Sequence, residues 1–130
     1  MTIERFGSGG PWEDSVGYSR AVRCGPFVMT AGCTSFVDGE LTEEGDPYAQ
    51  AKVAFGVAVG ALESAGCSVE DVVQTRMYLA HIRDADEVGR AHAEIFGHIR
   101  PAATMVAVNA FVLPRMLVEV EVVAYRPGSG

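Results

Sequence analysis

The hydrophobic pattern near the C-terminus predicts two buried β-strands joined by a loop around Pro114. Residues 104–108 and 117–125 are β-branched or apolar runs of strand length. In the second run, a period of two places Glu119 and Glu121 on one face, whereas the other face carries only valine and alanine. A carboxylate there is costly unless it is paired, hydrogen-bonded or at the edge of a wet cleft. These two acids therefore need a structural or chemical reason.

The same pattern predicts three more strands upstream. Residues 18–24 and 27–32 are short apolar runs separated by Gly25 and Pro26, which predicts a hairpin. Residues 69–79 predict another main strand. The remaining segments are predicted to be an irregular or edge-strand arm, a polar surface loop and a flexible tail: residues 1–16, 33–46 and 127–130.

A long and almost entirely apolar segment predicts the first helix. Asp46 is placed to cap the free amides, Pro47 occupies the first helical position, and the helix is expected to run to about Ala65. Gly56 and Gly60 are costly inside a helix, and their spacing places them on one side of it. They therefore predict a close approach of this helix to the sheet.

A second helix is predicted over residues 84–96, where apolar residues recur at helical spacing and Gly97 follows the end. Asp84 and Glu87 form a start that resembles a capping box. The order is then β-β-α-β-α-β-β in a single α+β domain, residues 1–130, with a mixed sheet and both helices on one face. Such a sheet leaves its other face to be covered by another subunit.

Length and charge narrow the classes of function. A chain of 130 residues supports one hydrophobic core. The 10 Lys and Arg against 17 Asp and Glu give a net charge of -7, and no basic patch with interleaved aromatic residues occurs. Nucleic-acid affinity rests on clustered cations, so no nucleic-acid partner is expected. The hydrophobic fraction of 48% favours a homo-oligomer.

Cysteine usage and the N-terminal pattern predict a reduced, cytoplasmic setting. Cys24, Cys33 and Cys67 are odd in number and lack CxxC spacing, which favours neither a disulfide framework nor a zinc site. We expect no targeting segment and no membrane span, because no basic region precedes an apolar stretch and no apolar run is long enough. Neither a metal nor an organic cofactor is expected.

Several other polar residues are candidates for a chemical role. His81, His92 and His98 lack the spacing of metal ligands and are expected to be solvated or locally hydrogen-bonded. Cys33, at the end of the sequence TAGC, is either a site residue or, as we favour, a small buried thiol beside a turn. The two glutamates of residues 117–125 are the stronger candidates.

Each of these glutamates allows two interpretations. In the first, the carboxyl group has a raised pKa in a cleft and orients water or exchanges a proton. In the second, it pairs with an arginine in a subunit interface, the candidates being Arg20, Arg76 and Arg115. The ion pair is favoured for Glu121, and both interpretations remain open for Glu119.

Taken together, the elements resemble a known family. The stretches GYSRAV, FVMTAG, AKVAFGVAVGALESAGCSVEDVVQTRMYL, RPAATMV and VEVEVVAY are similar, in the same order, to the YjgF/YER057c/UK114 family, also called the Rid or RidA family. The resemblance covers about residues 16–125, and ESAGCSVEDVV and VEVEVVA are its more specific parts. It implies a chorismate-mutase-like α+β fold and a homotrimer with helices outside, sheets inside and three clefts between adjacent subunits.

The resemblance also implies a chemistry. The best-understood members of the family hydrolyse reactive enamines and imines, made by pyridoxal-phosphate enzymes, to 2-keto acids and ammonia. The family tyrosine that lines the cleft corresponds to Tyr18, and the glutamate that orients the attacking water corresponds to Glu119. The arginine that holds the substrate carboxylate falls on Ala103, and a common cysteine falls on Met105. Without that clamp, binding of a 2-imino acid is expected to weaken roughly tenfold to a hundredfold.

The leading hypothesis is therefore a Rid-family hydrolase or deaminase that acts on a small imine or enamine without the usual clamp. Arg20 is a candidate replacement for the missing arginine, and Arg100 is a weaker one. A non-catalytic ligand-binding or scaffold trimer is the alternative, and a ribonuclease is least favoured because of the net charge. The catalytic candidates are Glu119 and Tyr18, and the substrate-binding candidates are Arg20, Ala31, Gly32, Cys33, Ala103, Met105 and Val106.

Overall fold

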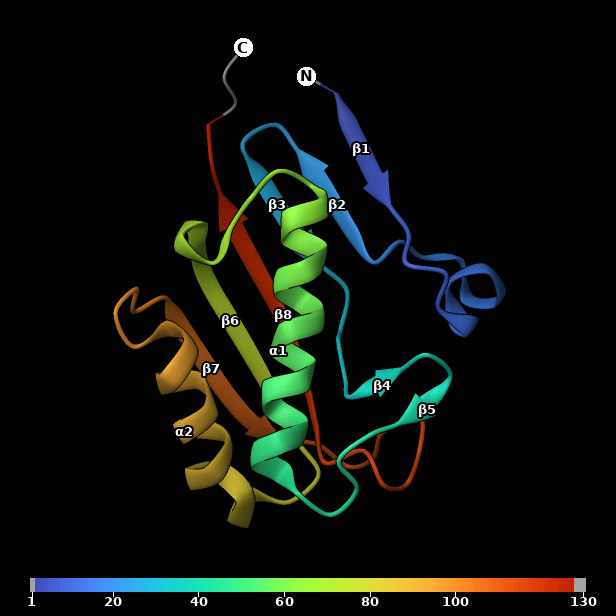
Figure 1. Cartoon of the computed structure of the whole chain (residues 1–130), viewed down its shortest axis with the longest axis vertical. Coiled ribbons are helices and arrows are strands. Elements are labelled where there is room, and N and C mark those ends of the chain that lie inside the picture. Colours follow the sequence, from blue (N-terminus) through green and yellow to red (C-terminus); the bar gives the residue numbers. More distant parts are fainter. Residues whose placement is uncertain (1, 128–130) are drawn as a thin grey trace.

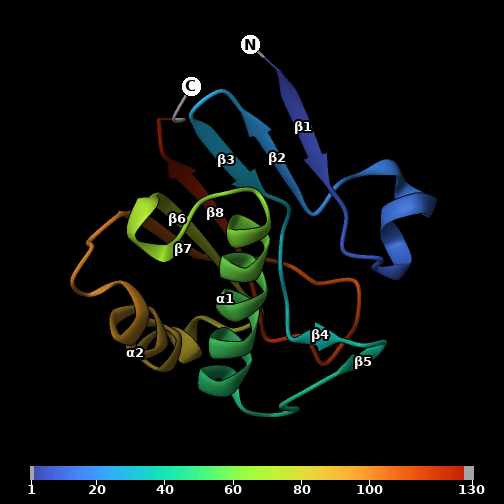
Figure 2. The same ribbon diagram turned by 45° about the horizontal axis from the view of Figure 1, so that its top comes forward.

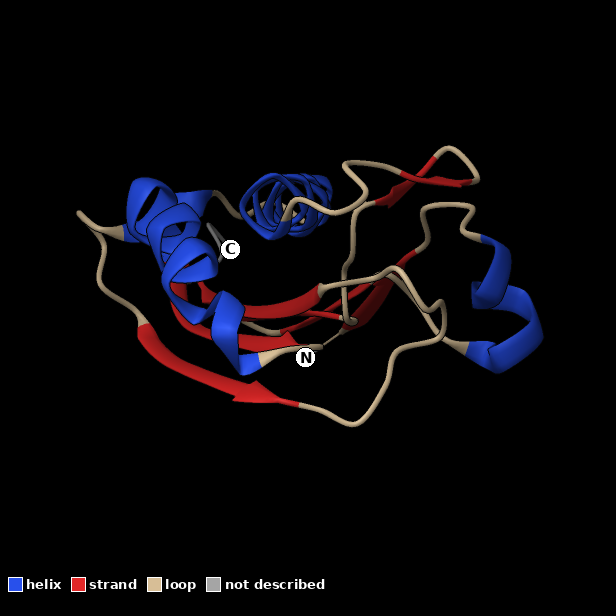
Figure 3. Cartoon of the chain, turned by 90° about the horizontal axis from the view of Figure 1, so that it is seen from below, coloured by secondary structure: helices blue, strands red, loops and turns tan. Residues whose placement is uncertain are grey.

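The computed structural model describes residues 2–127, which form a six-stranded sheet with two helices on one face (Figure 1). The sheet order is β1-β2-β3-β8-β6-β7, antiparallel except for the β6 and β7 pair. The strands and helices are β1 (Ile3–Phe6), β2 (Ala21–Cys24), β3 (Phe27–Thr30), β6 (Val72–Leu79), β7 (Ala102–Ala107), β8 (Val118–Tyr125), α1 (Pro47–Ser64) and α2 (Ala85–Phe96). Figure 3 shows both helices on the same side of the sheet, which confirms the predicted α+β arrangement.

Short elements fill the segments that were predicted to be irregular. The arm contains β1, which pairs with β2, and a π-helical turn at Glu13–Gly17. The predicted surface loop contains a second small sheet of β4 (Phe36–Val37) and β5 (Glu40–Leu41). A 3₁₀ turn at Val69–Asp71 delays the start of β6, and another lies at Ile82–Asp84. The predicted tail lies outside the described residues beyond Pro127.

The two helices begin differently from each other. The Asp46 side chain accepts a hydrogen bond from the Ala49 amide at 3.0 Å, which confirms the predicted cap of α1. The capping box predicted at Asp84 is wrong, because no side-chain bond caps α2 there. Asp84 ends the preceding 3₁₀ turn with φ -87° and ψ 4°, whereas a capping residue needs an extended backbone. A capping box is instead formed by Ser68 and Asp71.

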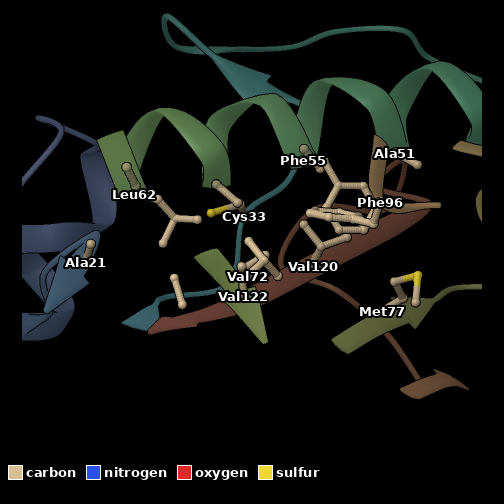
Figure 4. Close-up of a cluster of buried hydrophobic side chains, with 14 of the residues drawn as sticks. Ala21, Cys33, Ala51, Phe55, Leu62, Val72, Met77, Phe96, Val120 and Val122 are labelled. Carbon is tan, nitrogen blue, oxygen red and sulfur yellow. The ribbon is translucent and has the colours of Figure 1, made fainter. Parts of the chain in front are cut away.

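The core lies between α1, α2 and the helix-facing side of the sheet (Figure 4). Val118, Val120, Val122 and Ala124 of β8 are no more than 1% exposed. They pack beneath α1, whose buried residues are mostly alanines, so the helix lies close over the central strand. The alternation predicted for this strand is confirmed. The prediction that β7 is buried is wrong, because β7 is an edge strand and five of its six residues are exposed.

A buried glutamine fixes the start of β8. The Gln50 side chain of α1 is fully buried, donates to the Arg115 carbonyl at 3.1 Å and accepts from the Leu117 amide at 2.9 Å. These bonds satisfy backbone groups that would otherwise be buried without partners. They hold the loop before β8 against the helix, and so set the position of Glu119 two residues further along.

The other face of the sheet has no covering element among residues 2–127 (Figure 3). Phe27, Met29 and Tyr125 on this face are each 43% exposed. Arg76 lies 3.4 Å from the Glu121 carboxylate there, and the Tyr78 hydroxyl donates to the same oxygen at 2.6 Å. The favoured ion pair of Glu121 is thus formed with Arg76, but within one chain. Neither helix of the described residues is long and apolar enough to cross a membrane.

The expected role of the helix glycines is wrong. A Cβ added at Gly56 or Gly60 would meet no atom within 4 Å, because this side of α1 faces away from the sheet. The close approach to the sheet is made by the alanines on the opposite side of the helix.

The Gly56→Ala and Gly60→Ala substitutions are each expected to raise the free energy of unfolding by about 0.5–1 kcal/mol, because alanine loses less backbone entropy in a helix. Urea denaturation measures the change. Gly97→Ala is the control with the opposite expected sign. Its Cβ would stand 2.5 Å from the Ala93 carbonyl oxygen, so this substitution should lower the free energy of unfolding. If Gly56→Ala or Gly60→Ala also destabilises the chain, the inference that this side of the helix has room for a methyl group is wrong.

Candidate functional site

A cavity of about 580 Å³ lies where the N-terminal arm, the segment after β3, the β4–β5 hairpin and the start of β8 meet. Figure 2 shows the arm and the hairpin on the same side of α1. The polar lining includes Tyr18, Arg20 and Glu119. The apolar lining includes Trp12, Phe36, Val57, Val112 and Met116. The cavity therefore combines a mostly apolar wall with a few convergent polar groups, as ligand sites commonly do.

The Glu119 side chain lies directly over the α-carbon of Gly32. A Cβ at position 32 would stand 2.8 Å from the Glu119 carboxyl carbon, and it would overlap the carboxyl oxygen Oε2. The two segments are held together next to this contact, because Cys33 and Val120 exchange backbone hydrogen bonds of 2.7 and 2.9 Å. A residue with a side chain at position 32 would therefore displace the Glu119 carboxyl group from this position.

The environment of Glu119 favours the neutral acid more than water does. Burial raises the pKa of its carboxyl group, the Glu121 carboxylate raises it further, and Arg20 acts in the opposite direction. The Glu119 carboxyl group accepts no hydrogen bond from the described residues, so no such bond lowers its pKa. The carboxyl oxygens therefore keep their acceptor capacity for a water molecule or a ligand in the cavity.

Arg20 and Tyr18 form the second part of the site. Nη1 of Arg20 donates to the Gly32 carbonyl oxygen at 2.6 Å, and Nη2 donates to the Tyr18 hydroxyl at 3.2 Å. Because the Tyr18 oxygen accepts from the guanidinium, its own proton remains available to donate to a ligand. Arg20 thus holds a hydroxyl donor in the same cavity that Glu119 lines.

Glu13 lies behind this pair and is buried, with a side chain only 8% exposed. It accepts hydrogen bonds from the Ser8 amide at 3.0 Å, from the Ser8 hydroxyl and from the Gly10 amide at 3.2 Å. Its Oε2 lies 3.7 Å from Nη2 of Arg20. Burial alone would raise the pKa of Glu13, but these hydrogen bonds and the Arg20 charge together lower it. Glu13 is therefore an anion that ties the arm to Arg20.

Cys33 is 1% exposed at the edge of the cavity. Burial raises the pKa of its thiol, although Arg20, with Nη1 3.7 Å from the sulfur, opposes the shift. A thiol with a raised pKa is not a nucleophile at neutral pH. The structure therefore agrees with the small buried thiol that was favoured.

The remaining candidate groups lie elsewhere. Arg115 pairs with Glu44 at the surface rather than with either glutamate of β8. His92 bonds the Thr75 hydroxyl at 2.8 Å and packs between the aromatic rings of Phe55 and Phe96. Within residues 2–127, no group of three or more His, Cys, Asp or Glu side chains could hold a metal ion.

Six of the nine site candidates meet at this cavity: Tyr18, Arg20, Ala31, Gly32, Cys33 and Glu119. Ala103, Met105 and Val106 do not line it, because β6 separates their strand β7 from β8. These three residues can reach such a cavity only from a second copy of the chain.

Sequence reasoning missed Glu13, Trp12 and Phe36, which lie in segments without a periodic pattern. The one feature that could have indicated them is the adjacent pair Trp12 and Glu13 in an otherwise glycine-rich arm.

Comparison with known proteins identifies the family. A family model described as Endoribonuclease L-PSP matches residues 12–126. A crystal structure of a Mycobacterium tuberculosis member of the YjgF/YER057c/UK114 family superposes with a TM-score of 0.86 at 44% identity, covering 95% of this chain and 99% of that one. The chain belongs to this family. The resemblance inferred from GYSRAV and VEVEVVAY is thereby confirmed, as is the family fold.

Similar proteins occur in other organisms. An uncharacterized protein of Streptomyces coelicolor is 52% identical over 124 residues, covering 95% of this chain and 92% of the relative. A RutC family protein of Pyrococcus abyssi is 36% identical over 112 residues, covering 84% of this chain and 86% of the relative. The YjgF gene product of E. coli, at 24% identity and a TM-score of 0.78, covering 94% of this chain and 93% of that one, shares the fold. The correspondence of Ala103 to a family arginine stays a prediction.

Gly32→Ala is expected to lower the free energy of unfolding by about 1 kcal/mol, because the new methyl group overlaps the Glu119 carboxyl and displaces this side-chain end. Urea denaturation of the single and double variants measures this. In a Glu119→Ala background the same substitution should cost much less, since the overlapping group is gone. Equal costs in both backgrounds would contradict the contact.

Proposed function

We propose that this chain is a small-molecule hydrolase of the Rid type, which cleaves the C=N bond of a reactive imine or of the imine tautomer of an enamine. The observation that carries the proposal is the Glu119 carboxyl group, which has a raised pKa, faces a mostly apolar cavity and accepts no hydrogen bond from the described residues. A carboxyl group in that state is suited to general acid-base catalysis near neutral pH. Membership of the family supports the same reaction class.

The proposed reaction has two steps. The Glu119 carboxylate takes a proton from water as the water oxygen bonds to the imine carbon, and the C=N electron pair moves to nitrogen, which takes up a proton from solvent. Tyr18, whose hydroxyl accepts from Arg20, donates a hydrogen bond to that nitrogen. The protonated Glu119 then returns its proton to the amino group of the carbinolamine. Ammonia leaves as the hydroxyl oxygen loses its proton to solvent and forms the carbonyl. One proton is taken from solvent and one is returned to it, so imine and water give carbonyl compound and ammonia.

Assembly into a homotrimer is part of the proposal. The exposed Phe27, Met29 and Tyr125 make the uncovered sheet face suited to burial against further copies. In such an assembly, Ala103, Met105 and Val106 of one chain would complete the cavity of its neighbour. With alanine at position 103, that strand would bring no cation to the site.

Ribonuclease activity, which the description of the family model names, is not favoured for this chain. Among the described residues that line the cavity, Arg20 is the one cation, and Asp38 and Glu119 line it as well. Phosphate contacts need clustered cations. The net charge of -7 opposes nucleic-acid binding for the same reason.

The proposal is tested by generating an imine from 3-methylbutylamine with a flavin-dependent amine oxidase and catalase, and by following ammonia release. The protein is expected to accelerate release, and Glu119→Gln should reduce kcat at least about a hundredfold, because it removes the base. Glu70→Gln, which changes an exposed acid paired with His98, is the matched control.

Two results would count against the hydrolase. Acceleration that survives Glu119→Gln would remove the catalytic assignment of that residue. If neither this imine nor the 2-imino acid formed from leucine is hydrolysed faster, but ligands still bind, the chain is a non-catalytic binding protein.

The pH dependence of turnover should change when Glu121 is replaced. Glu119 must be ionised to act as base, so kcat/KM falls as the pH drops through its raised pKa. Glu121→Gln removes the carboxylate that helps to raise the pKa of Glu119, so the acid limb should move to lower pH. A pH profile of kcat/KM measures the shift. Glu70→Gln should leave the limb in place, and an unmoved limb in Glu121→Gln would contradict the coupling.

A further inference from the structure

Arg20, although it lies in the cavity, is already committed to partners in its own chain. Nη1 donates to the Gly32 carbonyl oxygen at 2.6 Å, Nη2 donates to Tyr18 at 3.2 Å, and Nη2 also lies 3.7 Å from Glu13. Its side chain is only 13% exposed. A carboxylate clamp needs two parallel N–H groups that face the ligand. Here each terminal nitrogen already donates a hydrogen bond within the chain, and the nearby Glu13 carboxylate offsets the charge.

Carboxylates outnumber cations around the cavity. Arg20 is opposed by Glu13, which holds the arm in place, while Asp38 and Glu119 add further acidic groups to the lining. A ligand carboxylate would therefore meet a neutralised arginine and nearby anions, a costly arrangement in a partly buried site.

The rest of the cavity wall is apolar and suits an apolar substituent of a ligand. Trp12 and Phe36 contact each other with ring centroids 4.9 Å apart. Val57, Val112 and Met116 continue the same surface. An aliphatic or aromatic substituent of a few carbon atoms fits such a wall, and the aromatic rings also tolerate a nearby cation.

We propose that this cavity selects imines that lack a carboxylate, and that Glu13 is the specificity-determining residue because it neutralises Arg20. The substrate class is an uncharged or protonated imine with an apolar substituent. Reactions that oxidise or otherwise dehydrogenate simple amines supply such imines, whereas amino-acid chemistry supplies 2-imino acids. This inference rests on the proposed hydrolase function but can be tested without turnover.

The binding test uses two stable ligands of the same shape, 4-methylpentanamide and 4-methylpentanoate. Trp12 is the single tryptophan of the chain and lines the cavity, so its fluorescence reports occupancy directly. The wild-type chain is expected to bind the amide at least about tenfold more tightly than the carboxylate. Equal binding, or tighter binding of the carboxylate, would overturn the proposal whether or not the chain is a hydrolase.

Glu13→Gln tests the role of the residue itself. The amide side chain keeps an acceptor for the arm but removes the negative charge, so the charge of Arg20 is no longer opposed by Glu13 and can attract a ligand anion. Affinity for 4-methylpentanoate should then rise roughly tenfold to a hundredfold. The double variant Glu13→Gln/Arg20→Gln should lose that gain. No gain in the single variant, or a gain that survives in the double variant, would contradict the assignment.

Two further variants separate charge from loosening of the arm. Ser8→Ala removes a hydrogen bond to Glu13 but keeps the ion pair, so the preference for the amide should persist. Glu13→Asp keeps the charge and should also retain that preference. If Ser8→Ala reverses the preference as Glu13→Gln does, then the arm position, and not the charge on Glu13, sets specificity.

Turnover gives an independent readout. Imine from leucine, made by an L-amino-acid oxidase, and imine from 3-methylbutylamine, made by the amine oxidase, differ only in the carboxylate. The ratio of their kcat/KM values should favour the second substrate in the wild type and shift toward the first in Glu13→Gln. Hydrolysis of both imines with a ratio that Glu13→Gln does not change would refute the role of Glu13 while leaving the hydrolase intact.

Discussion

The alternation of side chains along β8 is the constraint on which both the core and the cavity depend. One face of this central strand is entirely apolar and fully buried beneath α1. Because successive side chains point to opposite faces, the residues between them must lie on the other side of the sheet. Glu119 and Glu121 occupy that side. A shift of one residue in register would bury both carboxylates in the core, so the same hydrophobic contacts that stabilise the fold also fix the site.

The carboxyl group of Glu119 is held in an environment that costs stability. Its pKa is raised by burial and by Glu121, so its ionised form is less favourable in the folded chain than in water. The sign follows directly: with a folded pKa above the unfolded value, this group stabilises the fold at low pH, and that contribution is lost as the pH rises through its folded pKa. Strained or unfavourable groups of this kind are typical of functional sites, whereas Glu121 is satisfied by Arg76 and Tyr78.

Family membership and local geometry answer different questions. The family and its fold follow from similarity along nearly the whole chain. The arrangement of Glu13, Arg20 and Tyr18 is instead a property of this cavity, built by the segment that connects β1 to β2. Function is carried by such sites rather than by the fold. The proposed preference for imines without a carboxylate accordingly rests on charges and distances within residues 2–127 rather than on the relatives.

The sequence by itself determined the two helices, the order of the main strands along the chain and the face on which Glu119 lies, because these depend on local periodicity and on caps such as Asp46. Only the tertiary structure decided that Glu13 meets Arg20, that Gly32 leaves room for Glu119 and that Gly56 faces away from the sheet. These contacts join segments without periodic patterns or depend on which side of an element is buried. Local sequence encodes neither the path of an irregular arm nor the packing partner of a helix face, since both are set by long-range contacts.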